Sequence, residues 1–383
     1  MFRSHFIVAN LVYALTKITG LYLKAHRGFH SPKDRSDRRP IENSLQAYEI
    51  AWTSGIHLCE CDIALTKDEK LILAHDGDFS RLALDSSCEK STRKVQDLTF
   101  QEIMSVSLNS GVRPPLLLDV LQSANAIGGH SQLIIEIKPG NREATSALAR
   151  LFAQNPHLMA HCAVVMSFDS FAMHSLKEQM DALLGPTADD ARNARGGPRQ
   201  KVSNSHRRCY SMGIFPSAAA LARTASKDTA PPQDSRRPPA AAQQLSYRTP
   251  TYSRPKLLVL TVCETPRRDV ELEVSVADTD FHKKIQSWIK SSLDGVYLQF
   301  EQKMLTPEGS RVLKTLARRC YVGVWGHNGR DPDDYNTFNK LVKDGNASFV
   351  NSDLPLEFFH HDESLPPLPQ SQESSVASSE ASV

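Results

Sequence analysis

The stretch "HLCECDIA" at residues 57–64 sets the fold prediction for this chain. Its length and apolar character are typical of a buried β-strand, in which successive side chains point to opposite faces. Cys59 and Cys61 therefore share one face, and Glu60 and Asp62 share the other. A strand of this kind fits a barrel, where one face packs on helices and the other faces inward.

Seven further apolar, β-branched runs recur along the chain, and segments with helical spacing lie between them. The runs are "LYLKA" (21–25), "QLIIEIK" (132–138), "CAVVMSF" (162–168), "KLLVLTV" (256–262), "DGVYLQF" (294–300), "YVGVW" (321–325) and "ASFVNS" (347–352). The expected helices lie within residues 42–55, 99–108, 141–154, 170–180, 306–319 and 334–345. Eight strand–helix units in series predict one α/β domain, a (β/α)₈ TIM barrel over residues 21–361.

Three segments do not fit this pattern. Residues 185–253, between the fourth helix and the fifth strand, are rich in Pro, Arg, Ser, Ala and Gln, which predicts a disordered, low-complexity insertion. Residues 362–383 are acidic and Ser-rich, which predicts a disordered tail. Residues 1–20 carry an apolar run that is too short to span a bilayer; we expect a short helix, with a targeting segment as the alternative.

The overall charge gives little indication of a partner, because the chain has a formal net charge of +2. No nucleic-acid partner is indicated. The insertion holds eleven Arg or Lys against four Asp, so peripheral membrane contact through it or through the apolar N-terminus is the alternative to a solvated loop. Seven scattered cysteines favour a reducing, cytoplasmic compartment; membrane-associated and secretory locations remain the alternatives.

The thiols and carboxylates of residues 57–64 cannot form one site, because they point to opposite faces. Thiols can be buried between the strand and the surrounding helices without a partner. Two carboxylates that point inward require a cation or positive partners. A zinc–thiolate site would also need a second Cys or His pair at ligand spacing. The pattern therefore predicts a hard, oxygen-preferring divalent cation, Mg²⁺ or Ca²⁺.

A third carboxylate, Glu136, lies in the apolar run "LIIEIKPG", and Lys138 follows on the same face of the strand. An ionised Glu in such a run is costly unless it binds a metal or pairs with a cation. Glu136 is therefore a candidate third ligand, and a purely structural pair with Lys138 is the alternative.

Two histidines come directly after extended segments, His26 in "KAHRG" and His75 in "LILAHDG". A pair of histidines can act as acid and base on opposite sides of a reacting centre, but the sequence does not say which is which. Arg27 and Lys138 supply positive charge of the kind that a phosphodiester needs. Trp325 is a candidate substrate contact, with a core or rim position as the alternative.

Several motifs in this order resemble those of the glycerophosphodiester phosphodiesterase family. They are "AHRG", "ENSLQAYEIAWTSG", "CECDIALTKDEKLILAHD", "IEIKPGN", "VGVWGHN" and "FVNSDLP", and they span most of residues 21–356 with the insertion excepted.

This resemblance implies a TIM barrel with its site at the C-terminal ends of the strands. One divalent cation would be held by Glu60, Asp62 and Glu136, and Glu42 would complete or support that site. His26 and His75 would be the acid and base, and Arg27 and Lys138 would contact the phosphate.

The implied reaction splits a glycerophosphodiester, such as glycerophosphocholine, glycerophosphoethanolamine or glycerophosphoinositol, into glycerol 3-phosphate and an alcohol. Some members of the family act on lysophospholipids, so a lysophospholipase D is the alternative enzyme. An alternative from another class is a non-catalytic barrel that binds phosphodiesters or serves as a scaffold.

Overall fold

The computed structural model describes residues 23–30, 39–85, 87–185, 253–261, 293–326 and 334–353, together with residues 287 and 290. Three predictions lie outside the described residues: the N-terminal helix or targeting segment at 1–20, nearly all of the insertion at 185–253, and the tail at 362–383. No helix in the described ranges is long and apolar enough to cross a membrane.

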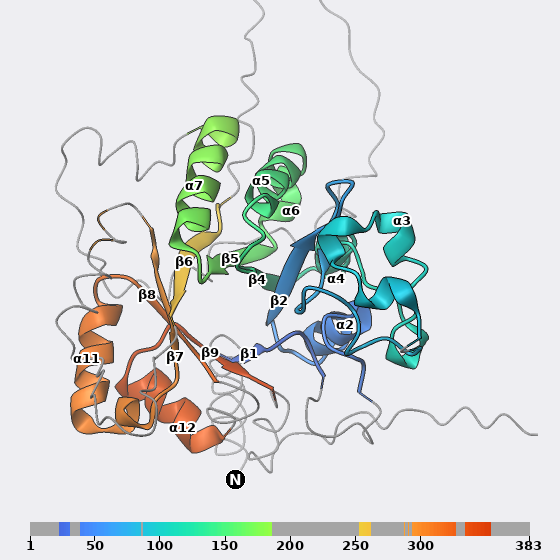
Figure 1. The fold of residues 1–383 in the computed structure, drawn as a ribbon. Helices are drawn as coiled ribbons and strands as arrows, with labels where there is room; N and C mark the ends of the chain where they lie inside the picture. Colours follow the sequence, from blue (N-terminus) through green and yellow to red (C-terminus); the bar gives the residue numbers. More distant parts are fainter. Residues whose placement is uncertain are drawn as a thin grey trace, which may run out of the picture.

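Eight parallel strands within the described part of the chain form a closed barrel (Figure 1). They are β1 (Leu23–Ala25), β2 (Leu58–Leu65), β4 (Gln132–Ile137), β5 (Cys162–Ser167), β6 (Lys256–Thr261), β7 (Gly295–Gln299), β8 (Tyr321–Trp325) and β9 (Phe349–Ser352). Each strand pairs with the next in this order, and β1 closes the ring by pairing with both β2 and β9. The predicted TIM barrel is confirmed.

The helices lie outside this ring, with α5 and α7 side by side (Figure 1). They are α2 (Leu45–Thr53), α3 (Phe100–Ile103), α4 (Leu117–Ile127), α5 (Ala144–Gln154), α6 (Pro156–Met159), α7 (Ser170–Leu184), α11 (Pro307–Ala317) and α12 (Tyr335–Asn339), which continues into a π-helical turn at Lys340–Asp344. Side chains cap several N-termini: Ser44 caps α2, Asp169 caps α7 and Thr306 caps α11. These caps fix where each helix starts after its strand.

The excursion between β2 and α4 departs from the simple barrel pattern. β3 (Leu71–Leu73) runs antiparallel to β2 and leads into a lobe with its own apolar core around Phe79, Leu98 and Ile103. The helix expected over residues 99–108 ends at Ile103, because the backbone beyond it pairs with residues 83–84 instead.

The two faces of β2 carry the side chains as the alternation predicts. Cys59 and Cys61 are buried in the core between the sheet and the helices. Glu60 and Asp62 lie on the inward face, above the apolar barrel interior around Leu58, which continues on the other strands. The strand thus delivers two carboxylates to the C-terminal end of the barrel.

Candidate active site

Three buried carboxylates meet at the C-terminal ends of β2 and β4. Asp62 and Glu136 are directly paired in the register of the two strands, and Glu60 lies one inward position earlier on β2. One oxygen of each residue lies within 4.8 Å of the others, and all three side chains are buried. The predicted ligand set is therefore brought together in one cluster.

Positive and polar groups surround Asp62. Its Oδ1 lies 2.7 Å from Nζ of Lys138, which also lies 2.8 Å from Oε1 of Glu136. Its Oδ2 lies 3.3 Å from Nε of Arg27 and accepts a 2.9 Å hydrogen bond from Nδ2 of Asn43. Both predicted phosphate contacts, Arg27 and Lys138, thus lie against the cluster.

The electrostatics of the three carboxylates differ. Burial and the neighbouring charge of Asp62 raise the pKa of Glu60 to about 8. Burial also raises the pKa of Asp62, but the charges of Lys138 and Arg27 outweigh it and hold that pKa below its usual range. Burial raises the pKa of Glu136, although Lys138 opposes the shift. Without a cation, burial and mutual repulsion disfavour full ionisation of the cluster.

The cluster fits a hard divalent cation. Within the described ranges, the buried Oε1 of Glu60 has no hydrogen-bond partner, and such an atom is costly unless a ligand occupies it. Three carboxylates form the donor set that Mg²⁺ and Ca²⁺ prefer. Burial raises the pKa of the thiols of Cys59 and Cys61 well above the usual range, so neither is a thiolate for a soft metal.

A tight turn after β1 brings His26 and Arg27 to the cluster. Arg27 has a left-handed backbone, with φ of 53°, and Gly28 follows at 80°. A Cβ on Gly28 would lie 2.8 Å from that of Ala47, so the turn packs closely on α2. In this conformation the backbone N–H of Arg27 donates to Oε2 of Glu60 at 3.0 Å.

His26 is held by an aspartate from the other end of the barrel domain. Its Nδ1 contacts Oδ1 of Asp353, which follows β9, and its Nε2 lies 3.8 Å from Oε2 of Glu60. A carboxylate only accepts, so Nδ1 carries a proton and Nε2 faces the cluster. Burial and Arg27 lower the pKa of His26, but the charges of Asp353 and Glu60 prevail and raise it.

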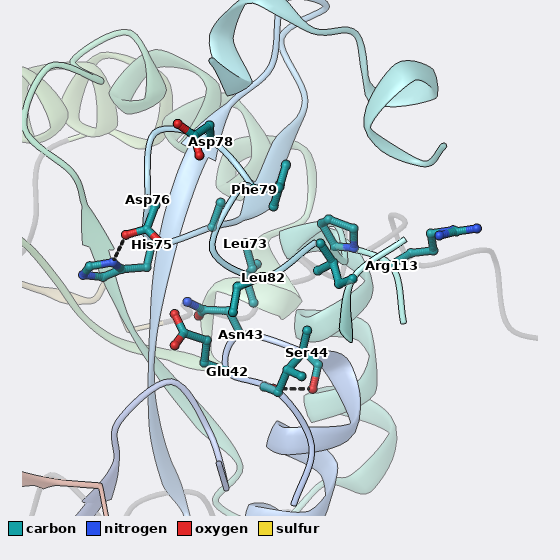
Figure 2. Close-up of a pocket in the computed structure, with 14 residues that line it drawn as sticks. Glu42, Asn43, Ser44, Leu73, His75, Asp76, Asp78, Phe79, Leu82 and Arg113 are labelled. Atoms are coloured by element: carbon teal, nitrogen blue, oxygen red, sulfur yellow. Dashed lines mark hydrogen bonds and ion pairs between the residues drawn. The ribbon is translucent and has the colours of Figure 1, made fainter. Parts of the chain in front are cut away.

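His75 follows β3 and has a similar partner. Its Nδ1 lies 2.7 Å from Oδ1 of Asp76 (Figure 2). The His75 ring is partly exposed. Its electrostatic interaction with Asp62 contributes to the lowered pKa of that carboxyl. Both histidines thus have Nδ1 on an aspartate, and each acts electrostatically on a carboxylate of the cluster, His26 on Glu60 and His75 on Asp62.

Glu42 lies beside the cluster and not within it. Its carboxylate accepts hydrogen bonds from Arg81, at 2.6 and 2.8 Å, and from Arg27, at 3.0 Å. Burial raises the pKa of Glu42, but the two arginines outweigh it and lower the pKa to about 2. Both carboxylate oxygens are occupied by these hydrogen bonds, and its predicted support of a metal site stays a prediction.

Trp325 ends β8, where its half-buried ring packs edge-to-face on Phe168, with 5.8 Å between the ring centroids. This position is at the rim of the barrel interior. Whether it contacts a substrate stays a prediction.

A small pocket, partly open to solvent, adjoins this site (Figure 2). Glu42, Asn43 and His75 line one side, and the side chains of Phe79 and Leu82 line the lobe side. The pocket has room for about one water molecule beside His75.

Four partners of the site were not predicted: Asn43, Asp76, Arg81 and Asp353. Asp76 follows His75 directly, and Asp353 lies in "FVNSDLP", so both were within quoted motifs. Asp353 lies 327 positions from His26, and no local pattern indicates that pairing.

The sequence matches the model of the glycerophosphoryl diester phosphodiesterase family over residues 26–204. The protein YhdW of Bacillus subtilis (strain 168), provisionally named a glycerophosphodiester phosphodiesterase, is 30% identical over 125 residues. That match covers 31% of this chain and 45% of YhdW, less than half of the relative's length.

Solved structures share the fold. A protein from Galdieria sulphuraria with the same provisional name has 14% identity and a TM-score of 0.54, covering 89% of this chain and 96% of its own. An Oleispira antarctica phosphodiesterase, in complex with the product sn-glycerol-3-phosphate, has 16% identity and a TM-score of 0.50, covering 91% and 99%. Residues 26–204, just under half of the chain, are thus similar to the glycerophosphoryl diester phosphodiesterase family.

Proposed function

We propose that this chain hydrolyses glycerophosphodiesters to glycerol 3-phosphate and an alcohol, and that the reaction depends on one divalent cation, Mg²⁺ or Ca²⁺. The observation that carries the proposal is the cluster of Glu60, Asp62 and Glu136, with His26 and His75 beside it. The match of residues 26–204 to the family model and the product complex of the Oleispira antarctica relative support the reaction.

Glu60, Asp62 and Glu136 would hold the cation, because they are buried oxygen donors and Oε1 of Glu60 has no other partner in the described part of the chain. When bound, such a cation polarises a phosphate oxygen and favours loss of a proton from a nearby hydroxyl. Arg27 and Lys138 would bind the phosphodiester, because a negative charge remains on it and both cations already lie at the cluster.

His26 and His75 would transfer the protons. With Nδ1 of each ring on an aspartate, Nε2 is the atom left for the substrate. One histidine would remove a proton from the attacking hydroxyl, either the glycerol 2-hydroxyl or a water, and the other would protonate the leaving alkoxide. Both rings have the same arrangement, with Nδ1 on an aspartate, so either histidine can be the base and the other the acid.

The test is release of glycerol 3-phosphate from glycerophosphocholine, glycerophosphoethanolamine and glycerophosphoinositol, with Mg²⁺, with Ca²⁺ and with chelator. Glu60→Gln is expected to abolish release, since it removes one donor of the cluster. Glu178→Gln, a matched change on the exposed surface of α7, is expected to retain it.

Choline release from lysophosphatidylcholine, measured in parallel, separates the alternative reaction. A lysophospholipase D would release choline without glycerol 3-phosphate. Absence of both products from folded, cation-loaded protein would refute the proposal and favour a barrel that binds phosphodiesters without cleaving them.

A further inference from the structure

A continuous chain of charged hydrogen bonds, closed by one ion pair between Arg27 and Asp62, runs from His75 to the carboxylate cluster. It begins at Nδ1 of His75, which lies 2.7 Å from Oδ1 of Asp76. The other oxygen of Asp76 accepts a 2.6 Å hydrogen bond from Nε of Arg81. Asp78 accepts hydrogen bonds from the N–H and the hydroxyl of Ser80 and so forms a turn just before Arg81.

The second half of the chain passes through Glu42. Nη1 and Nη2 of Arg81 donate to the two oxygens of Glu42, at 2.8 and 2.6 Å, as a bidentate pair. Nη1 of Arg27 donates to the same carboxylate at 3.0 Å, and Nε of Arg27 lies 3.3 Å from Asp62. The guanidinium of Arg81 thus joins the loop after β3 to the segment just before α2. Glu42, in that segment, joins Arg81 to Arg27.

We propose that Arg81 and Glu42 are positioning residues, which fix His75 and Arg27 relative to the carboxylate cluster, and that Glu42 is not a ligand of the cation. This inference rests on the proposed function, because it concerns the geometry of the same site. It assigns a role to Arg81, which is not in the predicted site. Of the two roles that the family resemblance implied for Glu42, completing or supporting the cation site, it keeps only the second.

The geometry supports this assignment in two ways. Arg81 uses three donors on two carboxylates from separate segments, and only the planar fork of arginine can do this. Oε1 of Glu42 accepts from two arginines and Oε2 from one, so hydrogen bonds already hold both oxygens away from the cluster. Asp76, fixed by Arg81, holds Nδ1–H of His75 and leaves Nε2 for the substrate.

The first measurement is cation affinity, by titration calorimetry with Mg²⁺ and with Ca²⁺ alone. We expect Glu42→Gln to keep affinity within about tenfold of the unchanged protein, whereas Glu60→Gln loses far more. Equal losses in the two variants would identify Glu42 as a ligand and overturn the inference.

The second measurement is ¹⁵N NMR of the histidine rings in folded protein. The unchanged protein should show His75 as the Nδ1–H tautomer, and Arg81→Gln should show a mixture, because Asp76 loses its anchor. Arg150→Gln, which removes an exposed pair with Glu69, is the control and should change nothing. An unchanged His75 signal in Arg81→Gln would also overturn the inference.

Kinetics then separate positioning from substrate binding. Arg81→Gln should lower kcat by about 10- to 100-fold with little change in KM. Arg81→Lys keeps the positive charge, so the charge balance of the folded protein is unchanged. It should not restore kcat, because lysine lacks the planar guanidinium that binds two carboxylates at once. Full activity in Arg81→Lys would contradict the proposal. If the unchanged protein cleaves no glycerophosphodiester, the proposed function fails, while the NMR and calorimetry still decide the positioning.

Discussion

Lys24 is a lysine whose whole side chain lies inside the barrel, on the inward face of β1. Its Nζ lies 2.9 Å from the centroid of the Phe349 ring and has no hydrogen-bond partner among the described residues. Burial holds the pKa of Lys24 well below its usual value, although the charge of Glu60 opposes the shift. An ammonium here costs stability, because two aromatic rings, Phe349 and Tyr297, replace the hydrogen bonds of water only in part.

Lys24→Met is therefore expected to raise the free energy of unfolding at pH 7 by about 1–3 kcal/mol. Between the lowered pKa of the folded protein and the usual lysine pKa, the unfolded chain holds a proton that the folded one has lost, so this residue makes stability rise with pH in that range. In Lys24→Met, the free energy of unfolding should rise less steeply with pH, because this contribution is absent. Urea unfolding from pH 6 to 9 measures both effects, with the exposed Lys314→Met on α11 as control. A less stable Lys24→Met would show that the amine has a stabilising partner.

Lys138 has the opposite environment, since its Nζ pairs with Asp62 and Glu136 at once. Lys138→Met should destabilise the protein by about 3–5 kcal/mol in chelator, because it leaves buried carboxylates without their cation. Added Mg²⁺ or Ca²⁺ should restore part of the loss, since a metal would neutralise the same oxygens. Thermal unfolding with and without cation measures this. Equal losses under both conditions would argue against a cation at the cluster.

At the scale of single elements, β7 and β8 show how closely the barrel interior is packed. Gly323 of β8 pairs with Tyr297 of β7, and an added Cβ would overlap the Tyr297 ring and lie 2.6 Å from Cε2 of Phe349. The missing side chain of Gly323 therefore makes room for the two rings under the site.

Gly323→Ala is expected to lower the free energy of unfolding by about 1–3 kcal/mol, because the two rings and their strands must shift. Gly77→Ala is the matched control, since a Cβ there meets nothing within 4 Å. Denaturant unfolding of the two variants checks the difference. Equal stabilities would mean that the interior can repack at no cost.

The strands could be predicted more fully than the helices. Each expected strand matches a strand of the barrel, because a strand buried on both faces is a short, nearly continuous apolar run. α4 was not among the expected helices, although its buried Leu117, Val120, Leu121 and Ala124 follow helical spacing. α3 is shorter than expected, since pairing across the lobe prevails over local helical spacing.

At the scale of the whole molecule, the cluster of Glu60, Asp62 and Glu136 could be predicted because strand alternation is local. The partners that orient it could not. Asp353 reaches His26 only because the barrel closes, and Arg81 reaches Glu42 only through the fold of the lobe. The chemical roles of all these residues stay predictions.

The barrel also brings together Gly185 and Arg254, which flank residues 186–252; that segment lies outside the described structure. Nη1 of Arg254 donates to Oδ1 of Asp181 on α7 at 2.6 Å, and its Nη2 contacts the carbonyl oxygen of Gly185. The chain therefore leaves the barrel and returns to it at one point, so a short connection can replace this segment.

Replacing residues 186–252 with a short Gly/Ser linker should leave the barrel folded and glycerol 3-phosphate release unchanged, because each described residue of the site lies on another segment. A shorter loop costs less closure entropy, so the free energy of unfolding should stay level or rise by up to about 2 kcal/mol. Urea unfolding and product release are measured on the same preparation, with an Arg254→Gln form of the linker variant to test the contact at the junction. A folded linker variant without activity would show that residues 186–252 contribute to the site, and an unfolded one would show that the barrel depends on them.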